Sequence, residues 1–277
     1  NCKDLYADYV KSNSFEKTMI RCLQSLIPYL KRDDEIDIQK IMNWEEVKEI
    51  IVPELVCTRR AGENLEDLIY RNVEGTDLAI IYRVKQQVAN IVGSIKVSKQ
   101  MMETWGVDEN RIHEFAFHNM NQLSTLQIVE LNSDFAMPEE TFSELPEKMN
   151  KYSSYVFTNK EAFYGAATIM EEGMLHSIAE RLQEGFYLLP MDVDNIVVYP
   201  EGMMKNLESI HSMVLIHNIQ CLEPENYLSD QVYYYSKEKG ELSMSTNPEN
   251  TQDVIIKILQ QAMECSPGKK EDYGEER

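Results

Sequence analysis

The chain has 277 residues, of which 43% are hydrophobic and 27% are charged, so it can bury a core as one large domain or two smaller ones. Its 47 acidic and 27 basic residues give a net charge of −20, which disfavours nucleic acid and anionic membranes as partners because both need clustered Lys and Arg. No apolar run approaches the ~20 residues of a membrane-spanning helix.

The cysteines are odd in number, dispersed and never spaced as C-x-x-C: Cys2, Cys22, Cys57, Cys221 and Cys265. This pattern indicates reduced thiols in an intracellular protein, without a disulfide framework or a thiolate zinc site. The first residues lack the basic start and apolar stretch of a signal peptide. We therefore expect a cytoplasmic protein. We also expect no cofactor, because the phosphate-binding and dinucleotide-binding fingerprints are both absent.

The first elements along the chain are expected to be helical. Apolar residues recur at steps of three and four at Phe15, Met19, Cys22, Leu26 and Leu30. Pro28 should kink or end this helix, because it supplies no amide hydrogen. Asn43 and Glu46 then form a capping-box pattern that predicts the start of a second helix within residues 43–51.

Strand patterns follow. Residues 77–84 form a continuous apolar run, which predicts an interior strand covered on both faces. Residues 91–97 alternate between apolar and polar, which predicts a strand with one solvent-exposed face. A helix is expected from Asp108 to about Leu123. Its expected buried stripe consists of Ile112, Phe115, Ala116, Met120 and Leu123.

In the second half, strands are expected at Tyr152–Asn159 and Phe163–Met170, followed by a helix through Leu175–Leu182 that stops at Gly185. Two strands then flank a corner in GFYLLPMDVDNIVVYP, residues 185–200. The remaining expected elements are a helix from about Met203 to Cys221, a hairpin with Gly240 in its turn, a helix over Asp253–Glu264 and a polar tail.

These elements predict an α+β fold, with a mostly antiparallel sheet, amphipathic helices packed on it and a helical N-terminal segment. An acidic stretch containing prolines, residues 137–152, is the weakest boundary. The expected parts are a helical segment (1–43), an α+β part with two central strands (44–137), a second α+β part (152–264) and a disordered tail (265–277). They could also form one continuous domain.

The corner carries Asp192, Asp194 and Asn195. Two carboxylates two residues apart could offer oxygens to a divalent cation, with Glu201 as a third ligand. The glycine and the final acid of a calcium-binding EF-hand loop are both missing. Asp and Asn also favour turns, because their side chains bond to their own backbone. We therefore favour a turn, and expect no bound metal; Asp192, Asp194 and Glu201 are the metal candidates.

The histidines form no recognisable metal motif. His113 and His118 are five residues apart, which rotates them about 140° around a helix, whereas a zinc-binding helix needs a spacing of four. His211 and His217 are six apart, and His217 falls on a buried stripe; His176 stands alone. We interpret these histidines as hydrogen-bonded residues of the fold.

Three consecutive tyrosines, Tyr233, Tyr234 and Tyr235, lie in the expected hairpin. In a strand Tyr234 must face opposite to its two neighbours. Tyrosine is common at interfaces, because it combines contact area with a polar tip, and it is also common as a half-buried strand residue. These three are our candidate interaction residues.

A resemblance to a known family rests on four ordered blocks: WGVDENRIHEFAFHNM, YVFTNKEAFYGAATIM, GFYLLPMDVDNIVVYP and YLSDQVYYY. They resemble an uncharacterised bacterial family, a domain of unknown function, from about Asp77 to Leu242. The resemblance implies an α+β fold and an intracellular bacterial setting, and no established activity. In similar proteins the corner usually reads Ser-Ser-x-His-Glu, a pattern that residues 191–195 of this chain do not follow.

The preferred hypothesis is a binding module, without enzymatic activity, for a protein partner or a small ligand. One alternative is a divalent-metal-dependent hydrolase using Asp192, Asp194 and Glu201, with His113 or His211 as the base. Another is an acidic neutraliser of a basic toxin or nuclease, for which the net charge is the support. The oligomeric state is left open.

Overall fold

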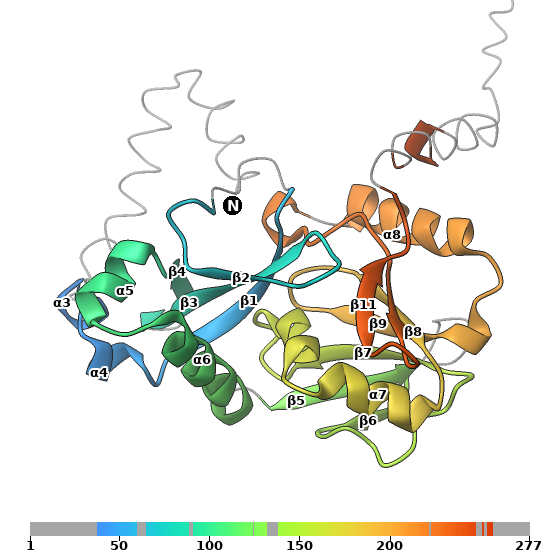
Figure 1. Cartoon of the computed structure of the whole chain (residues 1–277), viewed down its shortest axis with the longest axis horizontal. Coiled ribbons are helices and arrows are strands. Elements are labelled where there is room, and N and C mark those ends of the chain that lie inside the picture. The colour runs from blue at the N-terminus through green and yellow to red at the C-terminus, as the bar shows by residue number, and fades with distance from the viewer. Residues whose placement is uncertain are drawn as a thin grey trace, which may run out of the picture.

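A computed structural model of the chain describes residues 38–59, 65–88, 91–123, 125–131, 138–221, 223–247, 251 and 254–256. It contains two antiparallel sheets with helices packed on them, which confirms the predicted α+β class. In Figure 1 the first sheet lies beside the second. Helices α5 (Lys99–Trp105) and α6 (Glu109–Leu123) lie next to the first sheet, and α7 (Met174–Leu182) and α8 (Leu207–Cys221) lie next to the second.

The first sheet is built around β3 (Leu78–Val88). Along β3 run the other three strands, all antiparallel to it: β1 (Ile51–Cys57), β2 (Tyr70–Asn72) and β4 (Ile91–Lys96). Leu78 to Tyr82 are all buried, so the expectation of an interior strand is confirmed. The sequence patterns missed β1, because Pro53 and Glu54 interrupt a run that is nevertheless buried along its whole length.

Four helices flank the first sheet: α3 (Ile38–Ile41), α4 (Trp44–Val47), α5 (Lys99–Trp105) and α6 (Glu109–Leu123). Asn43 caps α4 as predicted, but its side chain accepts a hydrogen bond from the amide of Glu45. The helix ends early because β1 begins at Ile51. The predicted stripe of α6 is correct at its centre, and wrong at Leu123, which is 40% exposed.

The second sheet has seven strands in the order β11-β10-β8-β9-β7-β5-β6. Their bounds are β5 (Leu126–Leu131), β6 (Pro138–Phe142), β7 (Ser154–Asn159), β8 (Phe186–Pro190), β9 (Ile196–Pro200), β10 (Tyr233–Ser236) and β11 (Glu241–Met244). The predicted strands on either side of the corner form the β8–β9 hairpin. The predicted hairpin with Gly240 in its turn is β10–β11, and Gly240 has a φ of 68°.

Residues Phe163–Met170 were predicted as a strand, and this is wrong: Gly165–Met170 is a 3-10 helix, η1. Tyr164 before it has a left-handed backbone (φ 55°), which redirects the chain out of an extended path. A Cβ at position 165 would lie 2.5 Å from the backbone oxygen of Asp194, so the tight turn depends on glycine at this position.

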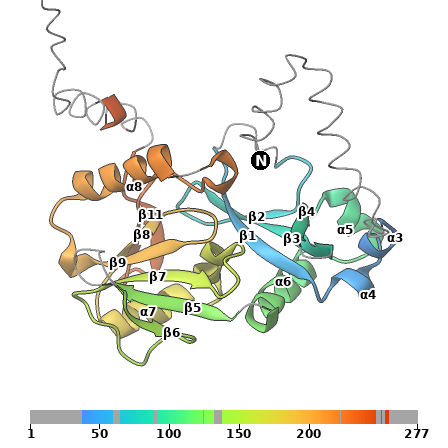
Figure 2. The same ribbon diagram turned by 180° about the vertical axis from the view of Figure 1, so that it is seen from behind.

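The two helices of the second half lie on opposite faces of the second sheet (Figure 2). Helix α7 (Met174–Leu182) packs into the main core, while α8 (Leu207–Cys221) covers a separate cluster formed by alternate residues of β8 and β9. Helix α7 ends at a left-handed Gln183 rather than at Gly185. Helix α8 begins at Leu207, because the preceding Glu201–Met203 forms a short 3-10 helix, η2; a further 3-10 turn, η3, covers Pro224–Asn226.

The two sheets share one hydrophobic core. A single cluster includes Leu55 and Tyr82 from the first sheet and Phe157, Phe186 and Tyr233 from the second. Polar contacts also join the sheets at two places. The Tyr233 hydroxyl donates to Asp77 Oδ1 (2.6 Å), in the turn before β3, and the Tyr164 hydroxyl lies 3.0 Å from Ser94 Oγ on β4.

One predicted helix lies outside the described residues, and another is described only in part. The N-terminal helix through Phe15–Leu30 and the tail after residue 264 lie outside the described residues, and of Asp253–Glu264 only residues 254–256 are described, as helical. Of the helices in the described ranges, none combines the length and the apolar character needed to cross a membrane.

Candidate functional site

Three tyrosines lie side by side on one face of the second sheet. Tyr234 on β10 is paired with Tyr187 on β8, which is paired with Tyr199 on β9. Side chains of directly opposed residues share a face, and the rings of Tyr187 and Tyr234 are 4.9 Å apart between centroids. We call these three residues the tyrosine row.

The row contains only one of the three tyrosines predicted from sequence. Tyr233 and Tyr235 point to the opposite face, as strand alternation requires, and are 0% and 4% exposed. Their side chains are therefore packed in the core and are not offered to a partner, which leaves Tyr234 as the accessible member of the predicted set. Tyr187 and Tyr199 were missed because strand pairing, which no local pattern reveals, brings them beside Tyr234.

Glu201 lies at one end of the tyrosine row. The Tyr234 hydroxyl donates to Glu201 Oε2 (2.9 Å). Partial burial and this hydrogen bond to Glu201 raise the pKa of Tyr234 to about 12. Burial also raises the pKa values of Tyr187 and Tyr199. All three phenols therefore remain protonated at neutral pH and can donate hydrogen bonds.

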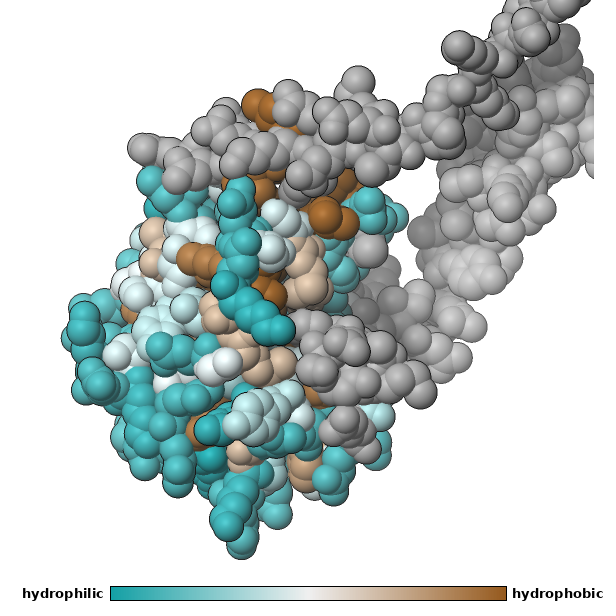
Figure 3. Space-filling view, turned by 90° about the vertical axis from the view of Figure 1, so that its right-hand side faces the viewer, coloured by the Kyte–Doolittle hydropathy of each residue, from teal (hydrophilic) through white to brown (hydrophobic). Residues whose placement is uncertain are grey.

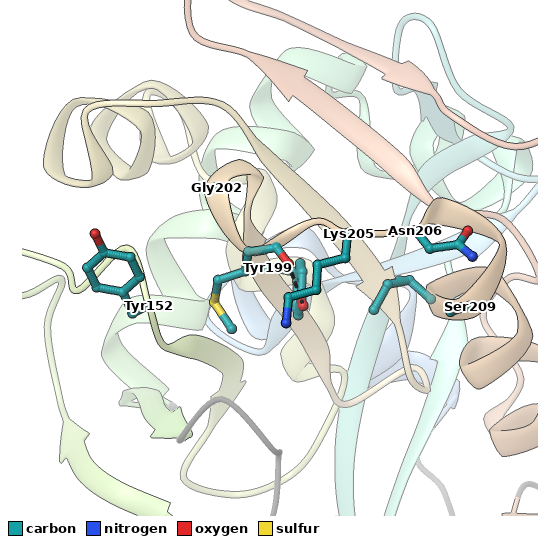
Figure 4. A pocket seen from close by; sticks show the side chains of 8 residues that line it. Tyr152, Tyr199, Gly202, Lys205, Asn206 and Ser209 are labelled. Atoms are coloured by element: carbon teal, nitrogen blue, oxygen red, sulfur yellow. Dashed lines mark hydrogen bonds between the residues drawn. The ribbon is translucent and has the colours of Figure 1, made fainter.

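A pocket of about 510 Å³ opens beside the row, between β9 and the start of α8. Its lining consists of Tyr152, Tyr199, Gly202, Met203, Lys205, Asn206, Ser209 and Ile210. Figure 4 shows Tyr199 and Lys205 near its centre, with Tyr152 at one end and Asn206 and Ser209 at the other. Aromatic, apolar and polar side chains thus meet around one cavity.

Hydrogen bonds fix the loop that forms one wall of the pocket. The Tyr199 hydroxyl donates to the carbonyl of Met203 (3.2 Å), and the amide of Gly202 donates to Glu184 Oε1 (2.8 Å). Asn206 Oδ1 accepts from the amide of Glu208 (2.9 Å) and so caps α8. These hydrogen bonds connect the wall to β9 and to the start of α8, so the pocket does not need a ligand to form.

The predicted acidic corner is a hydrogen-bonded turn. Asp192 Oδ1 accepts from the amide of Asp194 (2.8 Å), and both of its carboxylate oxygens accept from the side chain of Asn195. Asp194 Oδ1 instead accepts from the amide of Tyr164 (2.6 Å). Each carboxylate is engaged by the protein's own groups, as expected for turn residues.

The three metal candidates do not converge. Glu201 follows β9 whereas the corner precedes it, and five residues of strand span about 16 Å. Within the described part of the chain, no group of three or more His, Cys, Asp or Glu side chains is placed to hold a metal. The turn interpretation therefore accounts for the positions of Asp192 and Asp194.

Asp194 is nevertheless the most perturbed carboxyl of this region. Its burial, with the negative charges of Asp192 and Glu54 nearby, raises its pKa to about 6, against the lowering effect of hydrogen bonds from the amides of Tyr164 and Gly165. Sequence reasoning found the residue but not its environment, because Glu54 and Tyr164 are distant along the chain.

The histidines and Cys57 are not among the described residues that line the pocket. His113 Nδ1 lies 2.9 Å from the Tyr82 hydroxyl, and His211 Nε2 lies 2.8 Å from the carbonyl of Asp230. Burial lowers the pKa of both histidines. Burial raises the pKa of the Cys57 thiol to about 11, so it stays protonated at neutral pH. The prediction of hydrogen-bonded histidines is therefore confirmed for His113 and His211. It is wrong for His217, whose Nε2 is buried without a hydrogen-bond partner in the described part of the chain, and His118 and His176 are exposed.

The model of a family of unknown function (DUF5688) matches residues 1–237. The predicted resemblance to such a family is confirmed, and the match also includes the segment before Asp77. No curated protein and no solved structure matches the chain.

Proposed function

The chain belongs to the DUF5688 family, whose function is unknown, and we propose from the geometry of its site that it is a binding protein that holds a small ligand in the pocket beside the tyrosine row. The pocket carries this proposal. Its volume of about 510 Å³ falls within the ~300–1,000 Å³ of small-molecule sites.

The composition of the lining supports binding rather than catalysis. Tyr152 and Tyr199 supply ring surface, Met203 and Ile210 supply apolar contact, and Ser209 supplies a hydroxyl. Of the described residues that line the pocket, none is a histidine, aspartate or glutamate that could act as a general base. A cytoplasmic location remains part of the proposal and is supported by the dispersed cysteines of the sequence.

The test is a screen of small fragments by NMR, with the protein labelled at its methionine methyl groups. Met203 lines the pocket, and its signal is identified with Met203→Leu. We expect bound fragments to shift the Met203 signal and to leave the Met213 signal unchanged. Met213 lies on α8, packs against the hydrophobic cluster under that helix and is not among the described lining residues. Ser209→Phe should fill the pocket and abolish the shift.

A matched control is Gln220→Phe, which places the same ring on an exposed position of α8. This variant should bind fragments as the unmodified protein does. Fragment-induced shifts that spare Met203, or binding that survives Ser209→Phe, would contradict the proposal.

A protein partner is the second candidate, supported by exposed hydrophobic side chains at the pocket and further along α8. Tyr152 is 65% exposed, and Ile219 of α8 is 55% exposed. The face on the α8 side is mostly hydrophilic, with hydrophobic residues in its upper part (Figure 3). Tyr152→Ser and Ile219→Ser would weaken a protein contact, whereas only the first would affect a ligand in the pocket.

A further inference from the structure

We propose that the ligand of this pocket is a small planar molecule carrying an anionic group, either a carboxylate or a phosphate, with the anion held by Lys205. This inference rests on the proposed function and adds the chemical class of the ligand. The charge, the hydrogen-bond donors and the ring surface of the lining support it.

Lys205 is the charged residue of the lining, and it is exposed at the pocket. None of the ion pairs formed within the described ranges includes it. A second cation is close by, because Lys151 Nζ lies 5.3 Å from the centroid of the Tyr152 ring. Lys205 and Lys151 thus place positive charge at and beside the pocket, on a chain with a net charge of −20.

Two neighbouring carboxylates are already engaged outside the lining. Glu184 accepts from the amide of Gly202, and Glu201 accepts from the Tyr234 hydroxyl. Glu208 stands in the first turn of α8 and is exposed, and it does not line the pocket either. Glu184 therefore lies beside the lining residue Gly202, but among the described residues that line the cavity the charged side chain is that of Lys205.

The donors around Lys205 suit an anion. The Oδ1 of Asn206 caps α8, so the amide nitrogen of this side chain remains as a donor. The Ser209 hydroxyl follows in the first turn of the same helix, whose N-terminal end carries partial positive charge. A charged lysine with fixed donors beside it is the arrangement that binds carboxylate and phosphate oxygens.

The ring surface suits a flat molecule. Tyr199 lines the pocket as the end member of the tyrosine row, and Tyr152 lies across from it (Figure 4). Met203 and Ile210 add apolar contact between these polar groups. Aromatic side chains favour offset or edge contacts with a second ring, so a planar group is the expected body of the ligand.

The experiment titrates three compounds of the same shape and different charge, benzoate, benzamide and benzamidine, and follows the Met203 methyl signal. We expect affinity to fall in that order. Lys205→Gln should weaken benzoate about threefold to fivefold and leave benzamide unchanged, since one partly solvated ion pair is removed. Lys239→Gln removes the same charge in the exposed hairpin turn and should change neither affinity.

Inorganic phosphate and phenyl phosphate distinguish the two anionic groups: tighter binding of phenyl phosphate than of benzoate assigns phosphate, and the reverse assigns carboxylate. Equal binding of benzoate and benzamide, or a benzoate affinity that Lys205→Gln leaves intact, overturns the ligand class. If none of these compounds moves the Met203 signal while fragments from the screen do, the class is wrong and the binding function stands. If nothing moves it, both are wrong.

Discussion

At the scale of single residues, Asp194 gives a prediction about pH. Its pKa of about 6 lies above the ordinary value of 3.8, so the folded protein holds this proton more tightly than the unfolded chain does. The resulting stability is present below pH 3.8 and is lost as the pH rises through 6. Above pH 6 the charged carboxylate therefore costs stability, and Asp194→Asn should remove that cost while keeping an oxygen for the Tyr164 amide.

We expect Asp194→Asn to raise the melting temperature at pH 8 by roughly 2–4 °C, which corresponds to about 1 kcal/mol after allowance for solvent screening, and to lose this advantage near pH 4. Thermal melts across this range provide the measurement. Glu103→Gln removes one negative charge from an exposed position of α5 and controls for the net charge. An equal rise in the melting temperature of Glu103→Gln would show that reducing the net negative charge, and not the site of Asp194, stabilises the protein.

The same corner predicts the response to metal ions. The carboxylates of Asp192 and Asp194 accept hydrogen bonds from Asn195 and Tyr164, so they are not free to bind a cation. Millimolar Mg²⁺ or Ca²⁺ should therefore leave the melting temperature of EDTA-treated protein unchanged. A site filled to a hundredfold over its dissociation constant would add about 2.7 kcal/mol, or roughly 5–10 °C. A rise of that size that Asp192→Asn abolishes would restore the metal-dependent hydrolase hypothesis.

The parts of the site that rest on contacts between residues close in sequence could be predicted, and the parts that rest on contacts between distant strands could not. The turn at Asp192 follows from side chains that bond within three residues, and the opposite facing of Tyr234 follows from strand alternation. The tyrosine row does not follow, because Tyr187 and Tyr199 become neighbours of Tyr234 only through pairing of three strands. The pocket could not be predicted either, because its lining depends on where α8 begins. The sequence pattern placed that start at Met203, whereas the helix begins at Leu207.

At the scale of elements, η1 depends on a single glycine. A Cβ at position 165 would meet the Asp194 carbonyl oxygen at 2.5 Å and the Asn159 amide nitrogen at 2.7 Å, and neither backbone atom can move away cheaply. Gly165→Ala should therefore destabilise the protein by about 2–3 kcal/mol, as measured by denaturant unfolding. Gly93→Ala on β4 is the matched control, because no heavy atom lies within 4 Å of its added Cβ.

Elements with a clear period were predicted well, and those shaped by long-range contacts were not. Residues 77–84 were predicted as an interior strand because Leu78 to Tyr82 form an unbroken run of apolar and aromatic side chains, and α6 was predicted because its apolar residues recur at helical spacing. Strand β1 was not predicted because it contains a glutamate, Glu54. This residue is buried in an ion pair with Arg83 on the neighbouring strand, with 2.7 Å between Glu54 Oε2 and Arg83 Nη1. The 3-10 helix η1 was not predicted because its run of apolar residues is equally typical of a strand.

At the scale of the whole molecule, the shared core predicts that both sheets unfold together. One hydrophobic cluster spans them, and the Tyr233–Asp77 and Tyr164–Ser94 contacts join them at separate places. Both tryptophans of the chain, Trp44 and Trp105, lie beside the first sheet with their rings 5.7 Å apart, so tryptophan fluorescence reports on that side alone. The Met203 methyl signal reports on the second sheet.

Denaturant titrations followed by these two probes should give coincident midpoints, which is the behaviour of one cooperative unit. Tyr233→Phe removes the 2.6 Å hydrogen bond to the buried Asp77 carboxylate. It should lower the free energy of unfolding by about 1–3 kcal/mol and shift both midpoints together to lower denaturant concentration. Tyr234→Phe is the control on the same strand, since its hydroxyl bonds at the surface to Glu201. Midpoints that separate, with only the methyl signal responding to Tyr233→Phe, would instead divide the chain into two independently folding parts.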